Sequence, residues 1–195
     1  AEEFHPSDTV IVVRDSKIGW ATALREYIAM LYGGKIPQVD TSKLRPEGAP
    51  LKTFGGRSSG PEPLRKMLAE ITRIFKKAAG RKLNSVECHD IVCIIASCVV
   101  VGGVRRSALI SLSNLSDERM RNAKNGKWWE DNGQRALANN SVAYTEKPDI
   151  GVFMQEWHSL YESKSGERGI FNRVAAEKKA AENGRRVLGF DWGTN

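Results

Sequence analysis

The residues best suited to chemistry in this sequence are two adjacent arginines behind a pair of glycines, in the segment Gly102-Gly103-Val104-Arg105-Arg106-Ser107. Glycines allow a backbone to turn sharply or to approach a ligand closely. Guanidinium groups present planar forks of N–H donors that match phosphate or carboxylate oxygens. The segment therefore fits a phosphate-binding loop. It also fits a helix end followed by two solvated arginines, and the local pattern alone favours that second interpretation.

A second glycine-rich segment, residues 43–61, carries Arg45, Gly55, Gly56 and Arg57 among several prolines and serines. This composition fits a disordered linker. It fits also a structured loop whose backbone lies close to a ligand. Composition alone favours the linker.

The three cysteines, Cys88, Cys93 and Cys98, are spaced five residues apart on a predicted buried helix. Five residues correspond to about 500° of helical rotation, so successive sulfur atoms point to different sides. This spacing suits neither a zinc site nor a redox-active cysteine pair, and we predict buried free thiols. The three histidines show no metal-binding spacing either, so no metal site is predicted.

Composition excludes several classes of protein. The chain has 195 residues with 41% hydrophobic and 27% charged residues, which is ordinary for a folded domain and not for a disordered chain. The longest apolar run, residues 91–101, contains Ser97 and is flanked by charges, so no membrane span is expected. The acidic start and the odd number of cysteines predict a cytoplasmic protein without a secretory leader. A formal net charge of +7 points to phosphate-bearing partners.

Other polar segments give weaker signals. Trp128 and Trp129 lie close to Lys127 and Arg135, which is compatible with stacking against nucleic-acid bases. No basic stripe interleaved with aromatic residues accompanies them, so we interpret the tryptophans as packing residues. Residues 163–169 are predicted to form a turn between helices, with a phosphate or subunit contact as the alternative. Dinucleotide-binding, P-loop and nucleophile-elbow motifs are absent from the sequence.

Hydrophobic periodicity predicts helices and strands in alternation. Helices are expected over residues 20–32, 62–80, 84–102, 117–125, 152–163 and 175–182, and strands over 10–13, 107–112, 141–144 and 187–191. The helix that starts at Asn84 has a capping box with Glu87, and apolar residues on nearly every side predict that it is buried. Alternating strands and helices are typical of an α/β layer or barrel.

Taken in order, five blocks of this sequence resemble the adenosylcobalamin-dependent (class II) ribonucleotide reductases of the ribonucleoside-triphosphate reductase type. The blocks are residues 44–51 together with 54–61, then 101–108, 139–142, 166–172 and 193–195. The resemblance covers about residues 8–195. It implies an α/β fold that is the first half of the family's ten-stranded α/β barrel, with residues 1–195 as one partial catalytic barrel domain and no second domain.

The resemblance also assigns roles to the polar segments. Gly102, Gly103, Val104, Arg105, Arg106 and Ser107 match the loop that links a bound deoxynucleoside triphosphate effector to the substrate base and so sets specificity. Arg45, Gly55, Gly56 and Arg57 lie in a stretch expected near the effector site. Asn195 matches an active-site asparagine, whose amide hydrogen-bonds the ribose hydroxyls because it both donates and accepts.

The implied function is part of a vitamin B12-dependent ribonucleotide reductase, an oxidoreductase that converts ribonucleoside triphosphates to deoxyribonucleotides by thiyl-radical chemistry. The implied cofactor is adenosylcobalamin, with a dNTP or ATP effector. The expected partners are the remaining segments of the reductase, a ribonucleotide substrate and a thioredoxin-type reductant, and neither a membrane nor nucleic acid. None of the three cysteines matches a catalytic cysteine of the family, so the chain alone is expected to be incomplete and inactive.

Two other functions remain open at this point. A stand-alone regulatory module would bind nucleotides through the same loops without catalysis. A basic nucleic-acid-binding domain would account only for the charge of +7 and the tryptophans.

Overall fold

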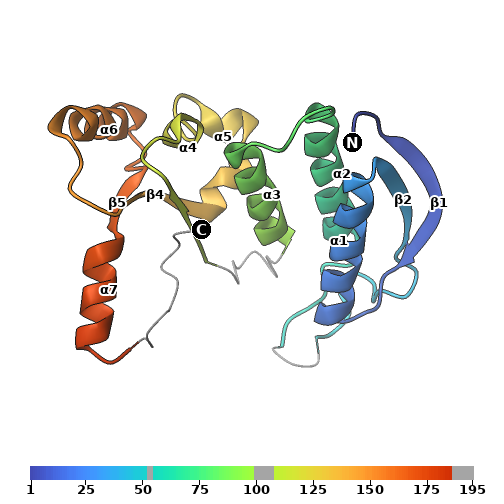
Figure 1. The fold of residues 1–195 in the computed structure, drawn as a ribbon. Coiled ribbons are helices and arrows are strands. Elements are labelled where there is room, and N and C mark those ends of the chain that lie inside the picture. The colour runs from blue at the N-terminus through green and yellow to red at the C-terminus, as the bar shows by residue number, and fades with distance from the viewer. Residues whose placement is uncertain (52–54, 99–107, 186–195) are drawn as a thin grey trace. The chain divides into compact units, whose positions relative to one another are not determined.

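The computed structural model describes residues 1–51, 55–98 and 108–185 (Figure 1). The chain divides into two compact units, Ala1–Ser107 and Ala108–Asn195. Each unit contains helices and a parallel sheet, so the predicted α/β class is confirmed. The prediction of one partial barrel domain over residues 1–195 stays a prediction. Among the described residues, no helix is long and apolar enough to cross a membrane.

The first unit begins with two parallel strands joined by a helix. β1 (His5–Val12) and β2 (Lys35–Asp40) pair in parallel, and α1 (Lys17–Tyr32) connects them. α2 (Glu62–Lys77) and α3 (Ser85–Cys98) follow, and Figure 1 shows α1 and α2 on the same side of the two strands. β2 was not predicted, because Pro37 interrupts the strand pattern and the segment leads into glycine- and proline-rich sequence.

One apolar core joins these elements. The predicted stripe of α2 is buried, namely Leu64, Met67, Leu68, Ile71, Ile74 and Phe75. It packs with residues of β1 and α1 such as Ile11, Tyr27 and Leu31. The hydroxyl of Tyr27 also lies 2.8 Å from Oγ1 of Thr72 on α2, which ties the two helices together. Since each such apolar side chain contributes about 1.5–3 kcal/mol, this core holds the loops of the unit in place.

α3 starts with the predicted capping box. The side chain of Asn84 accepts the N–H of Glu87 at 2.9 Å, and the carboxylate of Glu87 accepts the N–H of Asn84 at 2.9 Å. Arg81 donates to both carboxylate oxygens of Glu87, at 2.6 and 2.8 Å, and these hydrogen bonds lower the pKa of Glu87. The start of α3 is thus fixed by local contacts that the sequence displays.

The three cysteines of α3 are free, as predicted, but they differ in exposure. Cys93 is buried, Cys98 is partly buried and Cys88 is exposed, and Val92 is 45% exposed. The prediction of three buried thiols is therefore correct for Cys93 only, and the prediction that α3 is buried on nearly every side is wrong at Cys88 and Val92. Burial raises the pKa of Cys98 to about 11, so this thiol stays protonated at neutral pH. No group of His, Cys and acidic residues suited to a metal ion occurs among the described residues.

Gly19, in the first turn of α1, lies against the loop that precedes the helix. A methyl group at this position would overlap the carbonyl oxygen of Arg14. We expect Gly19→Ala to lower the free energy of unfolding by about 1–3 kcal/mol, although alanine intrinsically favours a helix over glycine. Urea unfolding measures the effect. Gly133→Ala is the control, because a methyl group there meets no atom within 4 Å; equal effects of the two substitutions would contradict the close contact.

The second unit carries a three-stranded parallel sheet in the order β3–β4–β5. Its strands are β3 (Leu109–Ser113), β4 (Ala138–Tyr144) and β5 (Gly169–Asn172). β3 and β4 are connected by the short helices α4 (Glu118–Arg121) and α5 (Trp128–Asp131) and by the 3-10 helix η1 (Gly133–Leu137). α6 (Ile150–Ser163) connects β4 to β5, and α7 (Arg173–Glu182) follows β5. The segment 163–169 therefore joins a helix to a strand, and its prediction as a turn between two helices is wrong.

The strands of this sheet pair in two parallel registers. Leu109, at the start of β3, pairs with Ala138 at the start of β4, and Tyr144, at the end of β4, pairs with Asn172 at the end of β5. Parallel strands with helical connections are what an α/β barrel is built from, so the sheet fits a fragment of one. The predicted strand over residues 187–191 lies outside the described residues.

The adjacent tryptophans of α5 are only partly packed. Their rings meet edge to face, with centroids 6.1 Å apart, and Nζ of Lys124 lies 5.3 Å from the ring of Trp128. Trp129 is 58% exposed. The interpretation as packing residues thus holds better for Trp128 than for Trp129.

Candidate functional site

The site residues that the sequence suggests fall in three segments, and the structure describes one of them. Arg45, Gly55, Gly56 and Arg57 lie in the first unit. The predicted specificity loop, which consists of Gly102, Gly103, Val104, Arg105, Arg106 and Ser107, lies outside the described residues. Asn195 also lies outside them.

The glycine-rich segment between β2 and α2 forms a hairpin. Pro50 and Arg57 make an antiparallel bridge, and the N–H of Leu51 donates to the carbonyl oxygen of Gly56 at 3.0 Å. Gly55 and Gly56 have φ angles of 64° and 86°, a left-handed conformation that glycine adopts without strain. The disordered-linker interpretation that composition favoured is therefore wrong for the described residues, because backbone hydrogen bonds join residues 48–51 to residues 56–58.

The two arginines of this segment brace the hairpin. Arg57 donates from NH1 to the carbonyl oxygen of Gly48 at 2.9 Å, and Arg45 donates from NH1 to that of Pro50 at 3.3 Å. Arg45 also donates from Nε to Oδ2 of Asp15 at 2.8 Å, which fastens the hairpin to the loop between β1 and α1. An arginine has five N–H donors, so both guanidinium groups keep donors for a ligand.

These groups gather where β1 and β2 end. Asp15 follows β1, and Thr41, which follows β2, accepts a hydrogen bond from Arg65 of α2 at 2.6 Å. The N–H of Ser42 donates to Oδ1 of Asp40 at 2.8 Å, and this bond lowers the pKa of Asp40. Parallel α/β sheets hold their ligands at the carboxyl ends of the strands, near the amino ends of the following helices. This arrangement can receive an anion such as a phosphate group.

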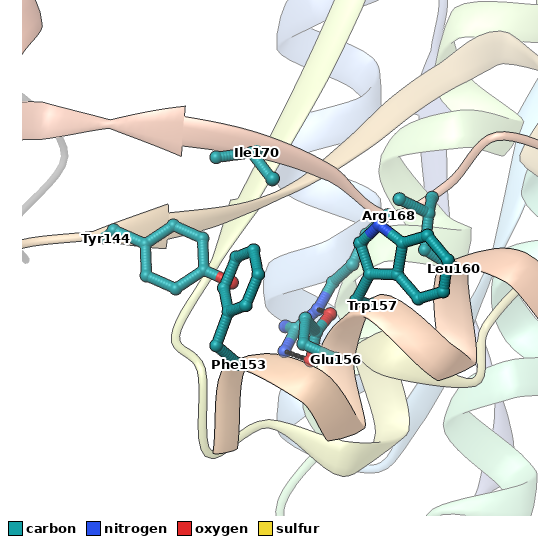
Figure 2. A pocket seen from close by; sticks show the side chains of 7 residues that line it. All are labelled: Tyr144, Phe153, Glu156, Trp157, Leu160, Arg168 and Ile170. Carbon is teal, nitrogen blue, oxygen red and sulfur yellow. Dashed lines mark hydrogen bonds and ion pairs between the residues drawn. The ribbon is translucent and has the colours of Figure 1, made fainter. Parts of the chain in front are cut away.

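A second polar centre, which sequence reasoning missed, is buried in the second unit. Arg168, directly before β5, is 2% exposed and uses all five of its N–H donors. Two donors bind the carboxylate of Glu156, from Nε at 2.6 Å and from NH2 at 3.0 Å (Figure 2). The others bind the end of β3 and the residues after it: the hydroxyl of Ser113 at 2.8 Å and the carbonyl oxygens of Asn114 and Leu115 at 2.9 and 3.1 Å.

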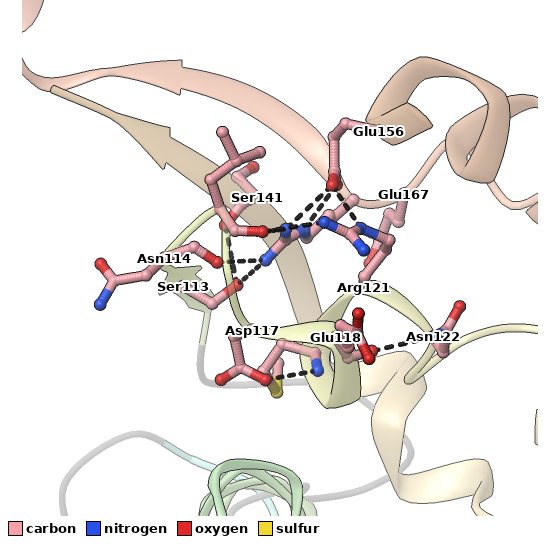
Figure 3. A network of polar contacts seen from close by, with 12 residues as sticks. Ser113, Asn114, Asp117, Glu118, Arg121, Asn122, Ser141, Glu156 and Glu167 are labelled. Carbon is pink, nitrogen blue, oxygen red and sulfur yellow. Dashed lines mark hydrogen bonds and ion pairs between the residues drawn. The ribbon is translucent and has the colours of Figure 1, made fainter. Parts of the chain in front are cut away.

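Arg121 of α4 completes this network (Figure 3). It donates from Nε to Oε2 of Glu156 at 2.7 Å and from NH2 to the carbonyl oxygen of Leu115 at 2.9 Å. Burial raises the pKa of Glu156, but the hydrogen bonds from Arg168 and Arg121 together outweigh it and lower the pKa. The carboxylate is therefore charged at neutral pH, and the network ties together the end of β3, α4, α6 and the start of β5.

Glu167, next to Arg168, binds a different strand. Its carboxylate accepts the N–H of Asn140 at 2.9 Å and lies 2.8 Å from Nζ of Lys124, which donates to the carbonyl oxygen of Ala138 at 2.6 Å. Glu167 and Arg168 thus both act inside the unit, where satisfied buried networks fix one arrangement of the chain. In the sequence, the one sign that Glu167 and Arg168 matter was their place in residues 166–172, a block that resembles the reductase family.

A small pocket opens beside this network (Figure 2). It is lined by Tyr144, Phe153, Glu156, Trp157, Leu160, Arg168 and Ile170. Burial, followed by the charge of Glu156, raises the pKa of Tyr144. Because most of the walls are apolar and Arg168 has no donor left, this pocket is a poor place for a phosphate group.

Comparison with known proteins gives one consistent result. Residues 2–75 match the family model described as the insertion domain of B12-dependent ribonucleotide reductase. The adenosylcobalamin-dependent ribonucleoside-triphosphate reductase of Levilactobacillus brevis is 34% identical over 172 residues, which cover 81% of this chain and 21% of that protein. The reductase of the same name from Lacticaseibacillus paracasei is 33% identical over 193 residues, covering 90% of this chain and 24% of that protein.

A solved structure is similar as well. The crystal structure of a B12-dependent (class II) ribonucleotide reductase matches with a TM-score of 0.59 at 29% identity, over 71% of this chain and 19% of that one. The chain thus spans about a fifth of the length of these proteins. The matched residues 2–75 contain β1, α1 and β2, and with them the whole hairpin that carries Arg45 and Arg57.

Proposed function

Since this chain belongs to the B12-dependent, class II ribonucleotide reductases, we propose that it is part of an enzyme that reduces ribonucleoside triphosphates to deoxyribonucleotides. The named activity of the L. brevis and L. paracasei relatives supports the substrate class and the dependence on adenosylcobalamin. A thioredoxin-type reductant, a dNTP or ATP effector and a cytoplasmic location belong to the same proposal. Because the chain spans about a fifth of its relatives, other segments of the reductase supply the radical chemistry.

The observation that carries this proposal is the arginine-braced hairpin at the ends of β1 and β2. We propose that Arg45 and Arg57 bind the phosphate groups of the effector nucleotide, and that Gly55 and Gly56 let the backbone approach it. Three facts support this role: both side chains reach the surface, both keep unused N–H donors, and the hairpin falls within the segment matched to the family's insertion domain.

Two further roles follow from the resemblance of the sequence blocks. Residues 102–107 would carry the effector signal to the substrate base, and the amide of Asn195 would hydrogen-bond the ribose hydroxyls. In this scheme the residues of this chain bind and orient nucleotides. Radical formation falls to groups elsewhere in the enzyme.

The pocket beside Tyr144 does not fit adenosylcobalamin. Its cavity volume is about 10 Å³, far smaller than a corrin ring with its adenosyl group. We therefore assign no residue of this chain to the cobalamin and derive no step through it.

Arg45→Gln/Arg57→Gln in the complete reductase is expected to weaken effector binding about 10- to 100-fold, since each tenfold corresponds to about 1.4 kcal/mol and two charge-assisted contacts are lost. Turnover without effector should stay unchanged. Equilibrium dialysis with a dNTP effector measures the affinity, and thermal unfolding checks that the hairpin remains folded. Arg73→Gln, on the exposed side of α2, is the matched control. An unchanged affinity in the double variant would rule out the effector role.

The second candidate is a stand-alone nucleotide-binding regulatory module. It is favoured by one observation: the hairpin belongs to a compact unit that has its own apolar core. Effector binding by the isolated chain, with no gain of reductase activity when the other segments are added, would favour this module over the reductase.

A further inference from the structure

Two buried side-chain atoms among the described residues lack a hydrogen-bond partner, and both belong to one end of the sheet in the second unit. They are Oη of Tyr144 and Nε of Arg173. Tyr144, the last residue of β4, pairs with Asn172, the last residue of β5, and Arg173 follows directly as the first residue of α7. Buried polar groups are nearly always satisfied. Tyr144 lines the small pocket beside α6, so Arg173 is the exception that the contacts described above do not explain.

Arg173 is the more unusual of the two because it carries a charge. The residue is 8% exposed and forms no ion pair among the described residues. The other buried cations of this unit are satisfied, since Lys124 pairs with Glu167 and Arg168 pairs with Glu156. A guanidinium is always protonated, and withdrawing a charge from water without a counter-ion is unfavourable. Nε of Arg173 therefore lacks a hydrogen-bond partner that an anion would supply.

The position of Arg173 suits an anionic ligand. α7 begins at this residue, and the amino end of a helix carries a partial positive charge. The first turn of α7 contains no acidic residue. The side chain of Asn172 already caps α7, because its Oδ1 accepts the N–H of Ala175 at 2.9 Å. The same place is the carboxyl end of two parallel strands, where α/β sheets hold ligands.

We propose that Arg173 is an anion-binding residue that takes a phosphate group of a nucleotide at the carboxyl ends of β4 and β5. A guanidinium matches phosphate oxygens in pairs, and the amino ends of helices recur in phosphate sites. Naming a nucleotide as the ligand rests on the proposed function. The inference of an anion rests on Arg173, which belongs to the second unit, whereas the hairpin belongs to the first.

Thermal unfolding of the full chain, with and without inorganic pyrophosphate, tests the proposal. Saturating pyrophosphate is expected to raise the melting temperature of the unaltered chain by about 5 °C. Arg173→Met should melt higher than the unaltered chain when pyrophosphate is absent, because methionine fills much of the same volume without an unpaired charge. The same variant should lose the rise that pyrophosphate produces.

The matched control is Lys178→Met, which removes the same charge from an exposed position on α7 and is expected to keep the pyrophosphate effect. Arg173→Gln provides a second variant, with pyrophosphate binding followed by ³¹P NMR, and is expected to bind at least tenfold more weakly. An Arg173→Met chain that keeps the pyrophosphate effect, or that melts lower than the unaltered chain, would overturn the proposal. So would Arg173→Gln binding pyrophosphate with unchanged affinity.

This test needs no turnover, so its failure and that of the proposed function are distinguishable. If the chain does not bind pyrophosphate while the complete reductase is active, the site at Arg173 is refuted and the proposed function stands. If the chain binds pyrophosphate through Arg173 while the complete protein reduces no nucleotide, the proposed function is refuted and the anion site stands.

Discussion

Replacing Arg168 with methionine is expected to lower the free energy of unfolding of the chain by about 3–5 kcal/mol, the usual effect of removing one partner from a buried ion pair. Among the described residues, the substitution leaves Glu156 with Arg121 as its only cation, and it takes three hydrogen bonds from the end of β3 and the residues after it. A domain is stable by only about 5–15 kcal/mol, so the loss is large. Urea unfolding, followed by the fluorescence of the tryptophans in the second unit, measures it.

Two companion variants show whether the geometry of the guanidinium matters. Arg168→Lys keeps the charge but offers three donors on a compact head group, so we expect a loss of at least about 1 kcal/mol, the net value of a typical hydrogen bond. Arg119→Met makes the same change as Arg168→Met at an exposed position of α4 and is expected to stay within about 0.5 kcal/mol. If Arg168→Met costs no more than Arg119→Met, the network does not hold the unit together.

Asn195→Ala in the complete reductase is expected to lower kcat about 100-fold, with the effector affinity unchanged. The reason is the proposed contact of its amide with the ribose hydroxyls, since losing a group that positions a substrate costs a factor of this order. Initial rates of deoxynucleoside triphosphate formation measure the effect.

The controls for Asn195 separate the role of the amide from general damage. Asn195→Asp replaces a group that donates and accepts with one that, when ionised, only accepts, and is expected to lose most of the activity as well. Asn183→Ala, at the exposed end of α7, is expected to stay within about twofold, because an exposed position away from the site contributes little. Full activity of Asn195→Ala would refute the assigned role.

Elements that depend on neighbouring residues could be predicted from the sequence. The stripe of α2 repeats at helical spacing, so its buried residues follow from periodicity. The capping box of Asn84 and Glu87 joins residues three apart, and the hydrogen bonds form as expected. Both cases involve interactions within one helix, which leave a clear pattern in the sequence.

Features that depend on distant residues could not be predicted in the same way. β2 pairs with β1, about thirty residues earlier, and nothing local to Pro37 shows that partner. The network around Arg168 joins α4, α6 and the end of β3, and a sequence does not show which of its many charges meet. Composition shows that the backbone at Gly55 and Gly56 is free to adopt a left-handed conformation. It does not show that Pro50 and Arg57 pair on either side of these glycines and so form a hairpin.

The most direct test of the central claim is an assay of ribonucleoside triphosphate reduction by the complete protein that contains this chain. Deoxyribonucleotide formation is measured with and without adenosylcobalamin, and for each substrate with and without dNTP effectors. We predict that product forms only when adenosylcobalamin is present, and that the preferred substrate changes with the effector. Absence of product with adenosylcobalamin and a thioredoxin-type reductant present, or equal rates without adenosylcobalamin, would contradict the assignment of this chain to a B12-dependent ribonucleotide reductase.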